Sequence, residues 1–164
     1  MNFTGKTVLV YGLGISGKGV AALLRRAGIS MVLYDGNPEY DSRALLEELG
    51  LPSDTRVCLG KLRAEDLKGI DILALSPGVS VFAPDVQMAA DLGITVLGEL
   101  EIAYELSKGK VIAITGTNGK TTTTTLTGEI MKAVYPEVFV VGNIGTSYAS
   151  VALDTTRSEE HTSE

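Results

Sequence analysis

The residues best suited to chemistry form a glycine-rich turn that ends in a lysine and two threonines. Residues 114–122 read Ile-Thr-Gly-Thr-Asn-Gly-Lys-Thr-Thr and lie between an apolar run and a predicted helix. Glycines let backbone N–H groups point inward at an anion, and a helix N-terminus adds partial positive charge. The turn therefore predicts a P-loop, in which Lys120 reaches the β- and γ-phosphates of a nucleoside triphosphate and the Thr121 hydroxyl coordinates Mg²⁺.

The match to the general P-loop pattern is partial. Ile114 stands where the first glycine of G-x-x-x-x-G-K-[ST] falls, so only the shorter G-x-x-G-K-T is present. The alternative is a plain strand-to-helix turn with an exposed lysine, although G-K-T after a strand has few other uses. We predict Lys120 as the catalytic residue and Thr121 as the metal ligand. The predicted ATP-binding residues are Gly116, Thr117, Asn118, Gly119, Lys120, Thr121 and Thr122.

A second glycine turn occurs near the start of the chain. Residues 12–17 read Gly-Leu-Gly-Ile-Ser-Gly, match G-x-G-x-x-G and directly follow an apolar run. Asp35 ends the next apolar run, where an acidic side chain could accept a ribose hydroxyl. The motif predicts a nucleotide site, while close packing of a strand on a helix would also explain the glycines. Which nucleotide binds stays open, but two such turns in one short chain indicate two nucleotide-type ligands.

Alternating strands and helices must position these turns. Short runs that are apolar on both faces are typical of parallel strands, and they alternate here with helical patterns, which predicts a doubly wound α/β domain. The predicted strands of this first series are 7–11, 31–34, 56–59, 70–75 and 94–97, and its helices are 16–27, 42–49 and 84–92.

A second series follows Gly98 and carries the P-loop. It comprises predicted helices at 99–106 and 120–134 and predicted strands at 111–114 and 138–141. We place the domain boundary near residues 93–98. This gives a Rossmann-like doubly wound domain at 1–95, the start of a P-loop ATPase-type α/β domain at 96–156, and a tail at 157–164.

Composition excludes several other classes of protein. The 164 residues hold 14 Lys and Arg against 20 Asp and Glu, a net charge of −6, with one Cys and one His. A disulfide scaffold and a Cys/His zinc module are excluded, and the acidic balance does not favour nucleic-acid binding. No signal peptide and no apolar run of about 20 residues is present, so we expect no membrane insertion and a cytoplasmic location.

Taken together, these motifs resemble the N-terminal part of the Mur ligase family. Besides the turns at 12–17 and 113–122, the resemblance rests on Ser-Pro-Gly-Val at 76–79, Gly-Glu-Leu-Glu at 98–101 and Gly-Asn-Ile-Gly at 142–145. The motifs occur in the family's order and spacing and cover nearly the whole chain up to about residue 156. The first glycine turn paired with Ser-Pro-Gly favours the branch that adds D-glutamate.

The resemblance implies that the first domain binds the UDP of a substrate and not NAD. Ser16 and its neighbours would hold the diphosphate, residues 35–37 would flank the uracil and ribose, and Asn143 would touch the sugar-peptide portion from the second domain. Gly36 and Asn37 depart from some relatives, which carry bulkier or basic side chains there. The implied UDP-substrate residues are Gly14, Ile15, Ser16, Gly17, Asp35, Gly36, Asn37, Ser76, Gly78 and Asn143.

The implied activity is ATP-dependent amide-bond synthesis in peptidoglycan biosynthesis. ATP with Mg²⁺ would convert the L-alanine carboxylate of UDP-N-acetylmuramoyl-L-alanine to an acyl phosphate, which the amine of D-glutamate attacks. The resemblance implies a monomer whose D-glutamate site lies in a further C-terminal domain. An NAD(P)-binding Rossmann oxidoreductase and a non-catalytic nucleotide-binding module are the alternatives, and a dehydrogenase has no use for a P-loop.

The end of the chain departs from the family pattern. In the family the central domain continues past Thr156 into a strand with a glutamate that helps to bind Mg²⁺. Residues 157–164 read Arg-Ser-Glu-Glu-His-Thr-Ser-Glu and resemble the translation of a sequencing-library adapter. We therefore expect a truncated product with a non-native tail, which lacks ligase turnover.

Overall fold

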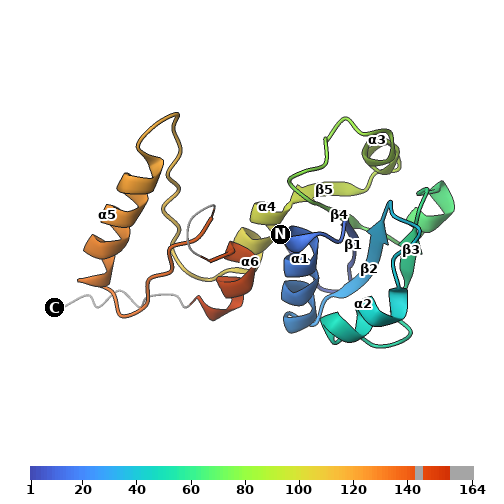
Figure 1. Cartoon of the computed structure of the whole chain (residues 1–164), viewed down its shortest axis with the longest axis horizontal. Coiled ribbons are helices and arrows are strands. Elements are labelled where there is room, and N and C mark those ends of the chain that lie inside the picture. Colours follow the sequence, from blue (N-terminus) through green and yellow to red (C-terminus); the bar gives the residue numbers. More distant parts are fainter. Residues whose placement is uncertain (143–145, 156–164) are drawn as a thin grey trace.

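A computed structural model describes residues 1–142 and 146–155 of the chain. Its first part alternates strands and helices, and the regular elements described after residue 98 are helices (Figure 1). The strands are β1 Thr7–Tyr11, β2 Ser30–Asp35, β3 Val57–Leu59, β4 Ile72–Leu75 and β5 Thr95–Gly98. The helices are α1 Ile15–Arg26, α2 Ser42–Leu49, α3 Pro84–Asp91, α4 Glu99–Leu106, α5 Lys120–Lys132 and α6 Tyr148–Val151, with 3-10 turns η1 Ala64–Leu67 and η2 Ala152–Asp154.

The five strands form one parallel sheet in the order β3-β2-β1-β4-β5. β1 is central, and its Val8 lies opposite Met31 of β2 and Ile72 of β4. The chain runs outward from β1 to one edge through β2 and β3, then crosses back to β4 and continues to the other edge. Strand order therefore reverses between β1 and β4, and open α/β sheets bind ligands beside the carboxyl ends of the strands at such a point.

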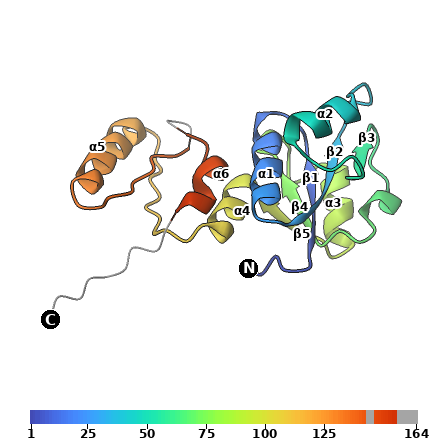
Figure 2. The same ribbon diagram turned by 90° about the horizontal axis from the view of Figure 1, so that it is seen from below.

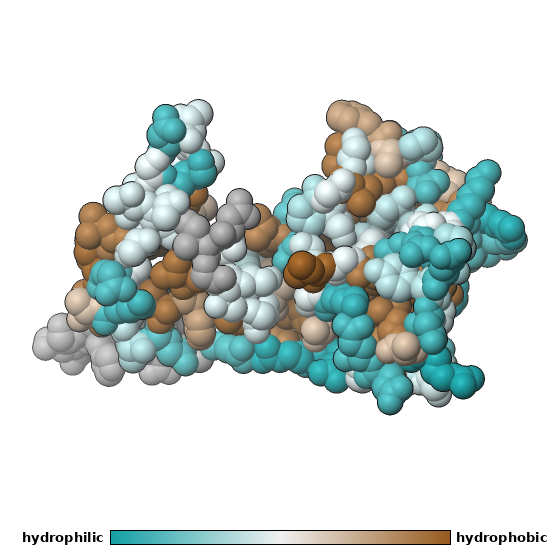
Figure 3. Space-filling model, viewed as in Figure 1, coloured by the Kyte–Doolittle hydropathy of each residue, from teal (hydrophilic) through white to brown (hydrophobic). Residues whose placement is uncertain are grey.

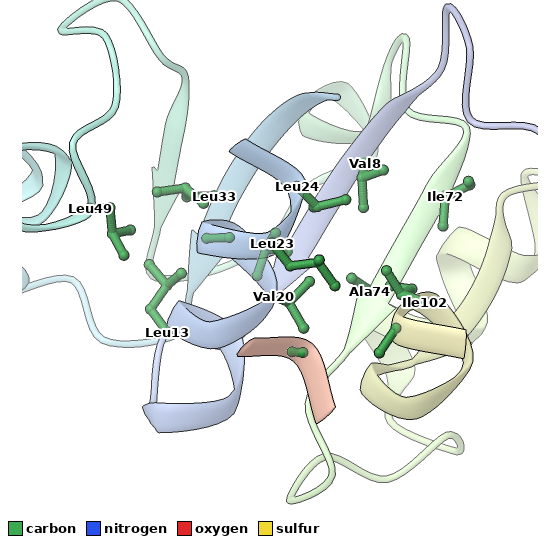
Figure 4. Packing of buried hydrophobic residues seen from close by; sticks show 14 of the residues in the cluster. Val8, Leu13, Val20, Leu23, Leu24, Leu33, Leu49, Ile72, Ala74 and Ile102 are labelled. Carbon is green, nitrogen blue, oxygen red and sulfur yellow. The ribbon is translucent and has the colours of Figure 1, made fainter. Parts of the chain in front are cut away.

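Helices cover both faces of the sheet, which is why the strands are apolar on both sides. Val8 and Val10 of β1 belong to the core under α1, α2, α4 and α6, whereas Leu9 belongs to the core on the η1 and α3 side. Side chains alternate between the faces of a strand, so one short apolar run supplies both cores. Figure 4 shows Val20, Leu23 and Leu24 of α1 against the first of these faces.

Local capping signals fix several helix ends where the sequence predicts them. The Asp41 carboxylate accepts hydrogen bonds from the backbone N–H groups of Arg43 and Ala44, at 3.0 and 3.1 Å, and so caps α2. Gly50 ends the same helix in the left-handed region at φ 60°. At α4 the Glu101 carboxylate accepts the Gly98 N–H at 2.6 Å. The predicted α/β class and all eight elements of the first series are confirmed, with ends that differ by two residues at most.

The two strands predicted in the second series are wrong. Residues 111–114 and 138–141 pair with no neighbouring strand in the described part of the chain, where a bridge between Val141 and Thr146 is the only such contact outside the sheet. A strand needs a partner for its backbone N–H and C=O groups, so apolar sequence alone does not make one. Val111 and Ile112 are 47% and 55% exposed, and Leu126, Ile130 and Val134 add to the apolar surface over α5 (Figure 3).

The chain returns to the first unit after α5. Figures 1 and 2 both show α5 standing apart from the sheet, while α6 lies beside α1 and α4. Arg26 of α1 donates to the Ser150 carbonyl at 3.0 Å and pairs with Asp154 at 2.5 Å. The Tyr148 hydroxyl donates to Ser107 Oγ at 2.7 Å. The domain division at residue 95 stays a prediction, and α4, α6 and η2 complete one core face of the sheet.

Candidate functional site

Three turns that the sequence predicts as substrate-binding meet at the carboxyl edge of the sheet. Residues 12–17 follow β1, residues 35–37 end and follow β2, and residues 76–78 follow β4. Parallel strands deliver their carboxyl ends to one edge, so turns far apart in the sequence become neighbours. The Ser76 hydroxyl lies 2.9 Å from the Tyr11 carbonyl and 3.2 Å from the Gly12 carbonyl.

The turn after β1 needs glycine for two separate physical reasons. Gly12 has φ 92°, in the left-handed region that side chains disfavour. Gly17 lies against the turn so closely that a Cβ would sit 1.7 Å from the Gly12 carbonyl oxygen. α1 begins immediately after Gly14 with no side-chain cap and no acidic residue in its first turn. Its first N–H groups therefore have no intrahelical partner and suit an anion.

Asp35 joins the β1 turn to the β2 turn. One carboxylate oxygen accepts the Leu13 N–H at 2.8 Å, and the other accepts the Asn37 N–H at 2.9 Å. Its backbone carbonyl accepts the Gly60 N–H at 2.9 Å, and the Gly12 N–H donates to the Tyr34 carbonyl at 2.8 Å. Gly36 and Asn37, which follow Asp35 in the chain, are exposed, and so is Gly78 in the turn after β4. Asn143 lies outside the described residues.

A tyrosine pair beneath this edge gave no signal in the sequence. The rings of Tyr11 and Tyr34 lie 4.6 Å apart, the Tyr11 hydroxyl donates to Asp85 of α3 at 3.2 Å, and the Tyr34 hydroxyl donates to the Gly60 carbonyl at 2.9 Å. Burial, followed by the nearby Tyr34 and Asp85, raises the pKa of Tyr11 well above its ordinary value. Burial also raises the pKa of Tyr34. The cluster fixes α3 to the end of β1.

The raised pKa of Tyr11 predicts a loss of stability at alkaline pH. In the unfolded chain the phenol ionises near its ordinary pKa of 10.0, while the folded state holds the proton. Above about pH 10 the unfolded state therefore binds fewer protons than the folded state, and the free energy of unfolding falls as pH rises. Tyr11→Phe should flatten this decline, measured as urea midpoints at about pH 8 and about pH 10.5. An equal decline in wild type and variant would contradict the assignment.

The predicted P-loop stands on the second unit, apart from the sheet in both views (Figures 1 and 2). Gly116 and Gly119 have φ 153° and 77°, which lets the turn curl before α5 begins at Lys120. The Lys120 ammonium donates to the Gly116 carbonyl and lies 3.4 Å from the Thr117 carbonyl. α5 has no acidic residue in its first turn and no side-chain cap. These features fit a bound phosphate.

A magnesium ion would find one protein ligand here. The Thr121 hydroxyl stands in the first turn of α5, and the described residues contain no cluster of three His, Cys, Asp or Glu side chains. Mg²⁺ keeps several waters and commonly binds through substrate phosphates, so a single hydroxyl beside a nucleotide fits its chemistry. No helix in the described part of the chain is long and apolar enough to cross a membrane.

The chain thus combines a Rossmann-like parallel sheet, a glycine turn between β1 and α1, and a second glycine-rich loop that ends in a lysine. The family model described as the N-terminal domain of MurD-like Mur ligases matches residues 6–98. The chain belongs to the Mur ligase family.

The similarity to curated relatives extends over nearly the whole of this chain. The chain is 47% identical over 155 residues to UDP-N-acetylmuramoylalanine–D-glutamate ligase of Lachnospira eligens, covering 94% of this chain and 34% of that protein. It is 46% identical to the protein of the same name from Lachnoclostridium phytofermentans, again covering 94% and 34%. The chain therefore spans about a third of the length of the curated relatives it matches.

Solved structures support the fold alone. A murein peptide ligase from Psychrobacter arcticus superposes with a TM-score of 0.53 at 24% identity, covering 78% of this chain and 26% of that one. A pseudomurein peptide ligase type C from Methanothermus fervidus gives a TM-score of 0.51 at 24% identity, covering 79% and 26%.

Proposed function

We propose that this chain is the N-terminal part of an ATP-dependent ligase that adds D-glutamate to UDP-N-acetylmuramoyl-L-alanine. The observation that carries the proposal lies at the carboxyl ends of the parallel strands. There, hydrogen bonds join the glycine turn at 12–17 to Asp35 and Ser76. This edge offers helix N–H groups to a diphosphate and leaves exposed turns beside them for the nucleoside. Relatives named for this reaction are up to 47% identical over nearly the whole chain.

Each unit has a separate role in the proposal. Residues 1–95 bind the UDP substrate through the N-terminus of α1 and the turns after β2 and β4. Residues 96–156 begin the ATP-binding domain, with Gly116–Thr122 around the phosphates. Asn143 completes the first site from the second unit. D-glutamate binds in a domain beyond these residues.

The chemistry follows from the difficulty of amide synthesis. A carboxylate is a poor electrophile, and ATP with Mg²⁺ supplies the phosphoryl group that makes the L-alanine carboxylate reactive as an acyl phosphate. Lys120 and the loop N–H groups hold the phosphates and neutralise the charge that develops on them. The Thr121 hydroxyl helps to hold the metal ion. Exclusion of water protects the acyl phosphate from hydrolysis.

The wider setting is also part of the proposal. The reaction belongs to peptidoglycan synthesis and so to cell-wall biogenesis, cell shape and cell division. We place the protein in the cytoplasm as a monomer without nucleic-acid partners. Residues 157–164 lie outside the described residues.

Binding measurements test the assignment of the first unit. We expect titration calorimetry on the 164-residue chain to show tighter binding of UDP-N-acetylmuramoyl-L-alanine than of NAD or NADP. UDP alone should compete, because the proposed contacts are to the diphosphate and nucleoside. NAD binding with no response to the UDP-sugar would favour an oxidoreductase and overturn the proposal.

A further inference from the structure

Asp35 makes contacts that a nucleotide-binding acid does not need. An acid at the end of the second strand of a Rossmann fold ordinarily contacts the ribose of a nucleotide. In this chain each carboxylate oxygen of Asp35 already accepts one backbone N–H, from Leu13 on one side and from Asn37 on the other. Hydrogen bonds to an ionised carboxylate are about twice as strong as neutral ones. The side chain is half-buried, so solvent does not fully replace these bonds when they are lost.

Leu13 is the residue through which this contact reaches the phosphate turn. Its side chain is fully buried in the core under α1 and α2, and its N–H is held by Asp35. Leu13 is therefore fixed through both its side chain and its backbone, and the next residue, Gly14, is the N-cap of α1. The direction of the first N–H groups of α1 depends on where Leu13 leaves the turn.

We propose that Asp35 is a positioning residue, which sets the glycine turn for the diphosphate by holding Leu13. This inference rests on the proposed UDP function and specifies how one of its residues works. Loss of the carboxylate leaves the Leu13 N–H unpaired and lets the turn populate other conformations. Apparent affinity falls in proportion to the fraction of molecules that keep the competent turn.

Asp71 provides a matched control at the other end of β1, where the strand begins. The Asp71 carboxylate accepts the Thr7 N–H at 2.8 Å, where β1 begins. Asp35 and Asp71 thus hold the two ends of the same central strand by the same kind of bond. Asp71→Ala removes a comparable hydrogen bond far from the glycine turn, and should leave nucleotide affinity unchanged.

The test compares Asp35→Ala with Asp71→Ala in the 164-residue chain, using UDP, 2′,3′-dideoxy-UDP and uridine. We expect Asp35→Ala to weaken UDP and dideoxy-UDP by the same factor, about tenfold, and to change uridine binding much less. A loss that disappears with dideoxy-UDP would show a ribose contact and overturn the inference. Unchanged UDP affinity would overturn it as well.

Amide hydrogen exchange tests the same inference without a ligand. Asp35→Ala should accelerate exchange of the Leu13 amide and of the amides at 14–17 while leaving Thr7 unchanged, and Asp71→Ala should do the reverse. If wild-type chain fails to bind UDP, the proposed function fails, and exchange still decides the role of Asp35. Unaltered exchange at Leu13 in Asp35→Ala would rule out the positioning role.

Discussion

Lys120→Ala is expected to weaken binding of Mg-ATP about 10- to 100-fold while leaving the affinity for the UDP ligand unchanged. A charge-assisted hydrogen bond contributes about 1.5–3 kcal/mol, which corresponds to this range. In the structure Lys120 donates to carbonyls of its own loop, so its ammonium is already held at the glycine turn. The UDP turns lie on the other unit, which explains why their ligand should not respond.

The same variant should fold normally, which separates binding from stability. Lys120 is exposed, and its partners are exposed loop carbonyls, so its loss should change the free energy of unfolding by no more than about 0.5 kcal/mol. Lys132→Ala is the matched control, because Lys132 stands in the last turn of the same helix and pairs with Glu129 at 2.8 Å. Titration calorimetry measures the affinity of both variants for Mg-ATP. Wild-type ATP affinity in Lys120→Ala would refute the P-loop assignment.

Gly17→Ala is expected to have the largest effect on the first unit, lowering the free energy of unfolding by about 3 kcal/mol and abolishing UDP binding. The added Cβ would lie 1.7 Å from the Gly12 carbonyl oxygen and 2.8 Å from its carbon. Both atoms are backbone, so no side-chain rotation relieves the clash. β1 and α1 must move apart, and the turn between them then loses the shape that faces the diphosphate.

Gly19→Ala provides the matched control two residues further along α1. Its Cβ would meet the Ala149 Cβ at 4.0 Å, an ordinary contact, and alanine favours a helix over glycine by about 1 kcal/mol. Gly19→Ala should therefore unfold at the same or a higher urea concentration than wild type. If Gly17→Ala unfolds with the wild-type midpoint and still binds UDP, α1 does not approach the turn as closely as the structure indicates.

The two proposed nucleotide sites differ in how they are built. The first is held by hydrogen bonds between three strand ends, and the Tyr11 hydroxyl adds a link to α3 through Asp85. The second is an exposed loop whose lysine bonds to its own turn. α6, which lies within residues 96–156, packs on α1, so the helix that would bind the diphosphate also contacts the second unit.

Local sequence features determined much of this fold. The helices at 42–49 and 99–106 form with the predicted bounds, because their caps and apolar faces lie within the segments themselves. The strands of the first series follow from short runs that are apolar on both faces. The two glycine motifs also indicated where strand-to-helix turns occur, since positive φ values and close backbone approach require glycine.

Other features depend on partners far away in the chain, and only the tertiary structure decided them. The apolar run at 111–114 was expected to be a strand, yet a strand forms only where a neighbour can take its hydrogen bonds. The return of α6 to α1 had no local signal, because Tyr148 and Arg26 find their partners across 41 and 124 residues.

For Asp35, the sequence determined one part of its role and the tertiary structure determined the other. The sequence placed an acid at the end of the second strand of a nucleotide-binding unit. The structure added that its two oxygens hold Leu13 and Asn37, because β2 pairs in parallel with β1 and brings the two turns to one edge. Residue type and spacing thus identified the site, while strand register decided which atoms in it are already engaged.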